Sequence, residues 1–347
     1  MKLDDLVKNS PSTNSANMDG FAEWLYNIKK VAEEYCDSEL LKLVNDAEMA
    51  LGSEFRRKEY KAKILPRIKD LIKKANYKGV VPKVDQNWDC CDATIIDRIR
   101  KAKALEIQLL GPDLEEAYKK AFEMLNKLEG LENVILHMPN AYNIIELSAC
   151  NQELKKKVEK MFFESDEYGK RHGIQFYVLF HIMDNYKHFV DFGGLPYLKE
   201  ILAFPVQTRV LLENSIRDIR LNDNSKTTLE QIFQVVDDEK LFFCFDLCHH
   251  QASENAFERR FELTDEQKQR LKSVHFSYTA NKDGYREKKK THGVAHPNVA
   301  LLTADLEYLK RLGVDVEKVW LVLEVNEDDY SDRASLRQEI MLFEQLK

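Results

Sequence analysis

The chain has 347 residues, a formal charge of −7, 44% hydrophobic residues and 32% charged residues. This hydrophobic fraction is ordinary for a globular protein and excludes a disordered or collagen-like chain. No stretch approaches the roughly 18 uncharged apolar residues that a membrane helix needs, and the N-terminus has no apolar signal region. We therefore expect a protein that is neither secreted nor bound to a membrane.

The six cysteines contain no Cys-x-x-Cys pair and no spacing that resembles a disulfide framework. In a chain of this length such cysteines are typical of reduced thiols in an intracellular protein. We expect a cytoplasmic protein at the nucleoid, or a nuclear one, and a monomer.

The N-terminal region divides into two predicted segments. Residues 1–17 are polar and are predicted to form a flexible arm. Residues 18–78 are predicted to form a helical appendage, since Phe21, Trp24 and Leu25 begin an apolar stripe with helical spacing. Pro66 falls within a later helical pattern, so that helix is expected to begin there. We interpret the appendage as a packing cap, with contact to a partner or to DNA as the alternative.

From residue 79 to residue 347 the pattern changes to short apolar runs that alternate with amphipathic segments. Eight such runs are present, at residues 80–81, 105–110, 134–136, 176–180, 209–212, 241–245, 274–276 and 319–323. Most are continuously apolar, as in strands that are buried on both faces of a parallel sheet. Helical patterns, such as residues 114–128 and 153–170, lie between several of them. This order predicts an α/β protein, a (β/α)8 TIM barrel with an N-terminal helical appendage.

An ionisable residue follows six of these runs at the predicted C-terminal end of the strand. These residues are His137, His181, Glu213, Asp246, His275 and Glu324. Their intervals range from 29 to 49 residues, which matches a βα unit of about 30 residues or more. Because the active site of such a barrel lies at the C-terminal ends of its strands, the six side chains are expected in one cup.

Metal ions are the natural compensation for this many ionisable groups, because buried charges without partners are unfavourable. One ion has four candidate ligands, Glu213, Asp246, His275 and Glu324. A second would use His137 and His181, with Glu213 as the bridge. A third would use His249 together with His292 or His296, of which we favour His296. The prediction is two or three divalent ions, zinc or manganese, a cluster that suits phosphodiester hydrolysis.

The strand ends resemble the endonuclease IV family of abasic-site endonucleases and the related UV-damage endonucleases of the xylose isomerase-like barrel superfamily. The resemblance covers roughly residues 79–347, and its strongest motif is the Asp-x-x-His of Asp246 and His249. It implies a trinuclear cluster and cleavage of DNA on the 5′ side of a lesion. It also implies catalytic roles for Glu213, as a bridging ligand, and for Glu324, near the attacking hydroxide.

Candidate DNA contacts lie in two loops beside the predicted cup. The segment 281–290 carries five basic residues, and Lys282, Arg286 and Lys288 are expected to contact phosphates. Tyr285 is expected to stack or wedge at a disrupted base, and Tyr142, in another loop, is expected to enter the same groove. The alternatives are a solvated charged loop and ordinary packing.

Three functions remain open from the sequence. The first is a metal-dependent DNA-repair endonuclease, a hydrolase that cleaves damaged double-stranded DNA 5′ of an abasic site or UV photoproduct. The second is a sugar or sugar-phosphate isomerase or epimerase, in which the four ligands hold one ion and the two glutamates shuttle a proton. The third is a non-catalytic barrel. We favour the first, because the second leaves the other histidines without a common role.

Overall fold

The computed structural model describes residues 3–13, 18–34, 38–75, 79–139, 152–182, 185–215, 226–257, 262–279, 293–326 and 332–346. The chain divides into two compact units, residues 1–77 and 78–346, and each is treated by itself below. Within the described residues, no helix is both long and apolar enough to cross a membrane.

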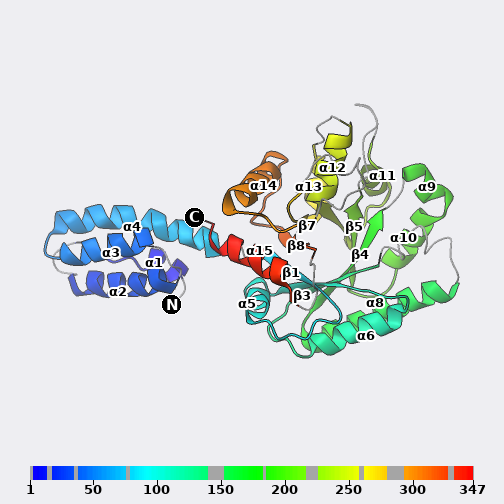
Figure 1. The fold of residues 1–347 in the computed structure, drawn as a ribbon, viewed down its shortest axis with the longest axis horizontal. Coiled ribbons are helices and arrows are strands. Elements are labelled where there is room, and N and C mark those ends of the chain that lie inside the picture. The colour runs from blue at the N-terminus through cyan, green and yellow to red at the C-terminus, as the bar shows by residue number, and fades with distance from the viewer. Residues whose placement is uncertain are drawn as a thin grey trace. The chain divides into compact units, whose positions relative to one another are not determined.

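The N-terminal unit is a group of four described helices that pack side by side (Figure 1). They are α1 (Leu3–Lys8), α2 (Met18–Glu34), α3 (Ser38–Met49) and α4 (Glu54–Ala75). The predicted stripe of α2 is buried, with Phe21, Leu25 and Ile28 fully inaccessible to solvent. Apolar residues of α3 and α4, such as Val44 and Ile68, complete this core.

Two predictions about the N-terminal unit need correction. Residues 3–8 form helix α1 instead of part of a loose arm, because Leu6 is buried in the core and its carbonyl accepts a 2.8 Å hydrogen bond from the Trp24 indole. Helix α4 does not begin at Pro66 but continues through it. The burial of Ile64 and Ile68 on either side of the proline outweighs the roughly 3 kcal/mol by which an interior proline disfavours a helix.

Replacing Pro66 with alanine is expected to stabilise α4 by about 1–3 kcal/mol, because the new N–H restores a helical hydrogen bond. The ring of Pro66 is exposed, so little packing is lost. Hydrogen–deuterium exchange of α4 peptides should slow relative to the wild type. Faster exchange would show that the proline ring contributes packing of its own.

The second unit is a closed barrel of eight parallel strands in sequential order, in which β1 also pairs with β8 (Figure 1). The strands are β1 (Val80–Asp85), β2 (Ala104–Gln108), β3 (Asn133–His137), β4 (Gln175–Ile182), β5 (Arg209–Asn214), β6 (Leu241–Asp246), β7 (Leu271–Phe276) and β8 (Trp320–Leu323). All eight predicted strands are present, and the TIM-barrel prediction is confirmed.

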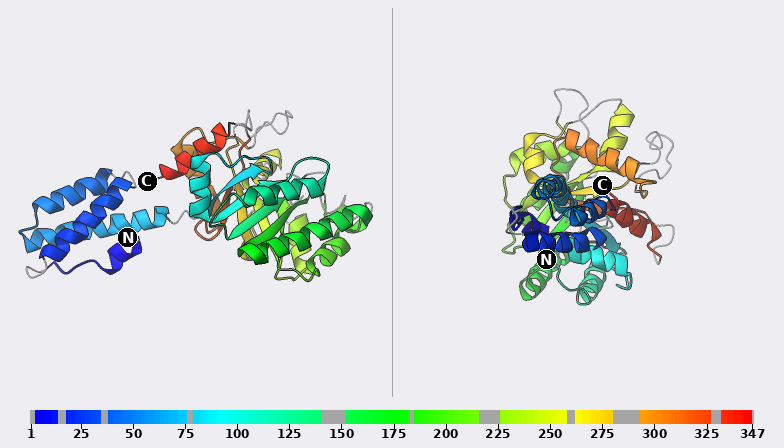
Figure 2. Two further views of the ribbon diagram at one scale, coloured as in Figure 1. Left: turned by 90° about the horizontal axis from the view of Figure 1, so that it is seen from below. Right: turned by 90° about the vertical axis from the view of Figure 1, so that its left-hand side faces the viewer.

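Helices surround the strands, as the two views of Figure 2 show for this unit. They are α5 (Ala93–Ala102), α6 (Leu114–Leu125), α8 (Gln152–His172), α9 (Tyr186–Asp191), α10 (Gly194–Leu202), α11 (Thr228–Val235), α12 (Leu247–Phe257), α13 (Asp265–Arg270), α14 (Val299–Arg311) and α15 (Ala334–Glu344). The strands are therefore buried on both faces, which explains their continuous apolar runs. Asp92 begins α5 by accepting hydrogen bonds from the amides of Thr94 and Ile95, as N-cap residues do.

Candidate metal and proton-transfer site

The site lies directly above a layer of small and apolar side chains inside the barrel. This layer includes Val81, Ala104, Ile135, Leu179, Leu211, Cys244 and Val322. Side chains two residues apart on a strand share a face, so the next inward position on each strand belongs to the following layer. These positions are Lys83, Glu106, His137, His181, Glu213, Asp246 and Glu324, and on β7 His275 pairs in register with Asp246. A two-residue repeat thus places the ionisable groups together at the C-terminal end of the barrel.

Four of these strand ends form the most complete group of metal-ligating side chains. We call Glu213, Asp246, His275 and Glu324 the quartet; their ligand atoms all lie within 4.8 Å of one another. His275 Nδ1 lies 2.6 Å from Glu324 Oε2 and 3.4 Å from Glu213 Oε1. The side chain of Glu324 is 31% exposed, so solvent reaches the quartet at this residue. One imidazole and three carboxylates suit manganese or zinc.

Two atoms of the quartet fit a bound cation particularly well. Glu213 Oε2 and His275 Nδ1 are buried, yet within the described residues neither makes a well-aligned hydrogen bond. Unsatisfied buried polar atoms are rare, and a missing ion is one explanation for them. Both atoms belong to the donor set, so a divalent ion would satisfy them together.

The charges of the quartet support the same interpretation. Burial, together with the carboxylates of Glu213 and Glu324, raises the pKa of Asp246 to about 7. Burial has the same tendency at Glu213, but the electrostatic interactions of this carboxylate with the imidazoles of His181 and His275 lower its pKa far below the usual value. Asp246 thus lies among like charges that a divalent cation would neutralise.

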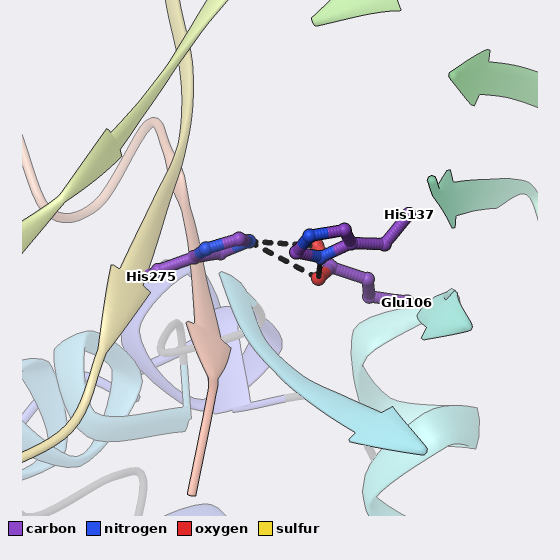
Figure 3. A group of neighbouring side chains, drawn as sticks. All are labelled: Glu106, His137 and His275. Carbon is purple, nitrogen blue, oxygen red and sulfur yellow. Dashed lines mark hydrogen bonds and ion pairs between the residues drawn. The ribbon is translucent and has the colours of Figure 1, made fainter. Parts of the chain in front are cut away.

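Glu106 is a site residue that the sequence analysis missed. It is completely buried on β2, and its carboxylate lies 2.8 Å from His137 Nδ1 and 3.1 Å from His275 Nε2. Figure 3 shows both imidazole rings pointing toward this carboxylate. Because His275 donates its Nε2–H to Glu106, the lone pair of Nδ1 is directed at the quartet. A carboxylate that orients a metal-binding histidine in this way also makes it a better ligand.

Lys83, on β1, was also missed. Its Nζ lies 2.7 Å from His137 Nδ1 and 3.2 Å from Glu106 Oε1, and it contacts Glu324 Oε1 as well. Burial favours a lower pKa for Lys83, but the carboxylates of Glu324 and Glu106 raise the pKa above its usual value. Each missed residue lies within a buried strand and has apolar neighbours on both sides, Pro82 and Val84 for Lys83, and Leu105 and Ile107 for Glu106. That interruption is the signal that would have identified them.

The structure also brings His137 and His181 to the cup. Their Nε2 atoms lie 3.3 Å apart, and His181 Nε2 lies 3.2 Å from Glu213 Oε2. These three residues form a second possible donor group. Burial lowers the pKa of His181 to about 4, so this ring is neutral at physiological pH.

His249 lies beside the quartet but outside the possible donor groups of the described residues. Its Nδ1–H donates a 2.9 Å hydrogen bond to the carbonyl of Asn214, and its backbone amide donates to Asp246 Oδ1 at 2.6 Å. The Asp-x-x-His spacing therefore makes a short turn that fixes the Asp246 carboxylate.

His296, our favoured ligand for a third ion, has other partners. Its Nδ1 lies 2.6 Å from Glu339 Oε1 and its Nε2 lies 3.2 Å from Asp305 Oδ2. The ring stacks on Phe276 and is fully buried. The structure therefore does not bring His296 to the metal-binding groups. The remaining predicted residues, His292, Tyr142, Lys282, Tyr285, Arg286 and Lys288, lie outside the described residues.

Replacing His296 with glutamine is expected to lower the free energy of unfolding by about 3 kcal/mol at pH 6, because it breaks a buried ion pair. Burial favours a lower pKa for His296, but Asp305 and Glu339 raise it above 6.5. The contribution of the charged ring is therefore complete below pH 6.5 and is lost as the pH rises through the raised pKa. Denaturant unfolding at pH 6 and pH 9 should show a smaller difference between the two proteins at pH 9. A difference that grows with pH would contradict this.

No family model matches the chain, and no curated protein matches it. Several solved structures resemble it over about three quarters of its length. A D-tagatose 3-epimerase-like protein is 18% identical, covering 75% of this chain and 96% of its own, with a TM-score of 0.45. A xylose isomerase domain protein from Planctomyces limnophilus is 11% identical. The match covers 76% of this chain and 98% of that protein, with a TM-score of 0.47. The 3-keto-D-glucoside 4-epimerase from E. coli is 12% identical. The match covers 77% of this chain and 100% of that protein, with a TM-score of 0.44.

These findings correct the prediction of a DNA-repair endonuclease and of a phosphodiester hydrolase. The similar solved structures are named as sugar epimerases and xylose isomerase-like proteins, not nucleases. The site provides a physical reason as well: His296, our favoured ligand for a third ion, has carboxylate partners at both ring nitrogens. The eight-stranded parallel barrel is the part of the resemblance that agrees with the fold, and possible groups of metal ligands are present.

Proposed function

We propose that the protein is a divalent-metal-dependent isomerase or epimerase of a sugar or a related polyhydroxy carbonyl compound. The quartet carries this proposal: three carboxylates and one imidazole from four consecutive strands converge within 4.8 Å at the open end of the barrel. Manganese or zinc would be held by Glu213, Asp246, His275 and Glu324. As a Lewis acid, the bound ion would polarise the carbonyl and hydroxyl oxygens of the substrate.

The two glutamates provide the acid and base chemistry. Glu213 comes from β5 and Glu324 from the end of β8, so the carboxylates reach His275 Nδ1 from different sides of the barrel. One carboxylate can remove the proton from the carbon next to the carbonyl, and the other can return a proton to the opposite face or to the neighbouring carbon. The first outcome is epimerisation and the second is isomerisation.

The barrel holds the proton-transfer groups rigidly. The side chain of Asn214 accepts a 2.7 Å hydrogen bond from the Asp246 amide and donates a 3.1 Å bond to the Asp246 carbonyl. These two bonds join the ends of β5 and β6, the strands that carry Glu213 and Asp246. Fixed placement of reacting groups is a large part of catalysis by proton transfer.

The test is the incorporation of deuterium from D2O. The protein, loaded with manganese or zinc, is incubated with a panel of aldoses, ketoses and their phosphates, and the products are followed by NMR. We expect deuterium at a carbon next to the carbonyl of at least one sugar, with a new epimer or isomer. The chelator-treated protein should lose this activity and recover it on addition of metal. Absence of exchange across the panel, in protein that has bound metal, would reject the proposal.

A further inference from the structure

The barrel contains more metal-binding side chains than one ion requires. The described residues form three overlapping groups of possible ligands: the quartet, Glu106–His137–His275, and His137–His181–Glu213. The second and third groups share His137, which the quartet does not include. A side chain that controls His137 would therefore control how many ions the barrel binds.

Lys83 already occupies the space between the possible ligands Glu106 and His137 of the second group. Figure 3 shows this group, Glu106, His137 and His275, without the lysine. A lysine ammonium has three N–H donors and no acceptor. Lys83 Nζ has three acceptors around it: His137 Nδ1 at 2.7 Å, Glu106 Oε1 at 3.2 Å, and Glu324 Oε1. A divalent ion between Glu106 and His137 would lie in contact with this positive charge, which is strongly unfavourable in a buried site.

The ammonium of Lys83 also lies close to the third group. It is 2.7 Å from His137 Nδ1, on the same imidazole ring whose other nitrogen belongs to that group. Nε2 is the atom that faces His181 Nε2 at 3.3 Å and Glu213 Oε2 at 3.8 Å. An ion bound by His137 Nε2 would lie across one imidazole ring from the Lys83 ammonium, and two positive charges this close repel each other strongly in a buried site. Lys83 therefore also disfavours an ion at the His137–His181–Glu213 group.

From these contacts we propose that Lys83 limits the barrel to a single divalent ion, held by the quartet, because its ammonium supplies the charge that a second ion would bring. This inference rests on the proposed function for the ion at the quartet. It makes Lys83 a residue that determines metal stoichiometry. His137 and His181 would then lie beside the single ion and would not bind a second one.

The experiment counts ions per chain. Wild type and the Lys83→Met variant, whose unbranched apolar side chain has nearly the same length, are saturated with manganese or zinc, desalted and analysed by elemental mass spectrometry. We expect one ion in the wild type and two in Lys83→Met. The charge-retaining Lys83→Arg variant should bind one. A Lys83→Met/His181→Ala variant should also return to one, which would locate the second ion at His181.

Titration of the wild type with cobalt(II), followed by its visible absorbance, gives the same count without a substitution and covers the case in which Lys83→Met fails to fold. Saturation at one equivalent is the expected result. Two ions in the wild type, or one ion in folded Lys83→Met, would overturn the role of Lys83 and leave the isomerase proposal intact. Deuterium exchange decides that proposal separately: one bound ion without exchange would reject the isomerase and keep the limit set by Lys83.

Discussion

Replacing Glu213 with glutamine is expected to lower the rate of deuterium exchange into the substrate by about 10³-fold, the order of magnitude for loss of a general acid or base. Glutamine has nearly the same shape as glutamate, so the barrel should remain folded. Because Glu213 also belongs to the quartet, the rate is measured with saturating metal, which separates proton transfer from loss of the ion.

The control is Glu317→Gln, the same change at an exposed position on the barrel. It should exchange deuterium at the wild-type rate. If Glu213→Gln with bound metal also exchanged at that rate, Glu213 would have no part in proton transfer, and the two-glutamate mechanism would be wrong.

The second large effect is expected at Glu106. This carboxylate has no exposed surface, and it accepts from His275 Nε2 at 3.1 Å and pairs with Lys83 at 3.2 Å. Replacing Glu106 with alanine removes one of the carboxylates that pair with the buried ammonium of Lys83. Removal of one member of a buried ion pair lowers the free energy of unfolding by about 3–5 kcal/mol. Denaturant unfolding of the metal-free proteins measures this difference.

Loss of Glu106 should also weaken metal binding by about 10- to 100-fold, since this carboxylate orients His275 from behind. The matched variant is Glu106→Gln, which keeps the size and a hydrogen-bond acceptor but loses the charge. It should fall between alanine and the wild type in both measurements. An alanine variant with wild-type stability would show that Lys83 does not depend on Glu106.

The strands were predictable because their signal is local. A strand that is buried on both faces must be apolar throughout, so Phe176–Phe180 and Leu241–Phe245 stand out in the sequence. The quartet was predictable for a related reason, since Glu213, Asp246 and Glu324 follow such runs directly and His275 lies within the run 274–276. Glu106 was missed because it lies inside its run, where a single charged residue was taken as part of the strand, and Lys83 was missed because the predicted run, 80–81, ends before it. The continuation of α4 through Pro66 was missed because a local rule was outweighed by packing.

The eight-stranded barrel and the convergence of Glu213, Asp246, His275 and Glu324 at one end of it follow from local patterns in the chain, because strand burial and a two-residue repeat are properties of short segments. The contacts between individual groups depend on the folded molecule. Lys83 and Glu324 are 241 positions apart, and His296 meets Glu339 across 43 positions. Such contacts determine which nitrogen of a histidine carries a proton and which is open to a metal ion. They depend on how distant segments close on one another, and local sequence patterns do not contain that information.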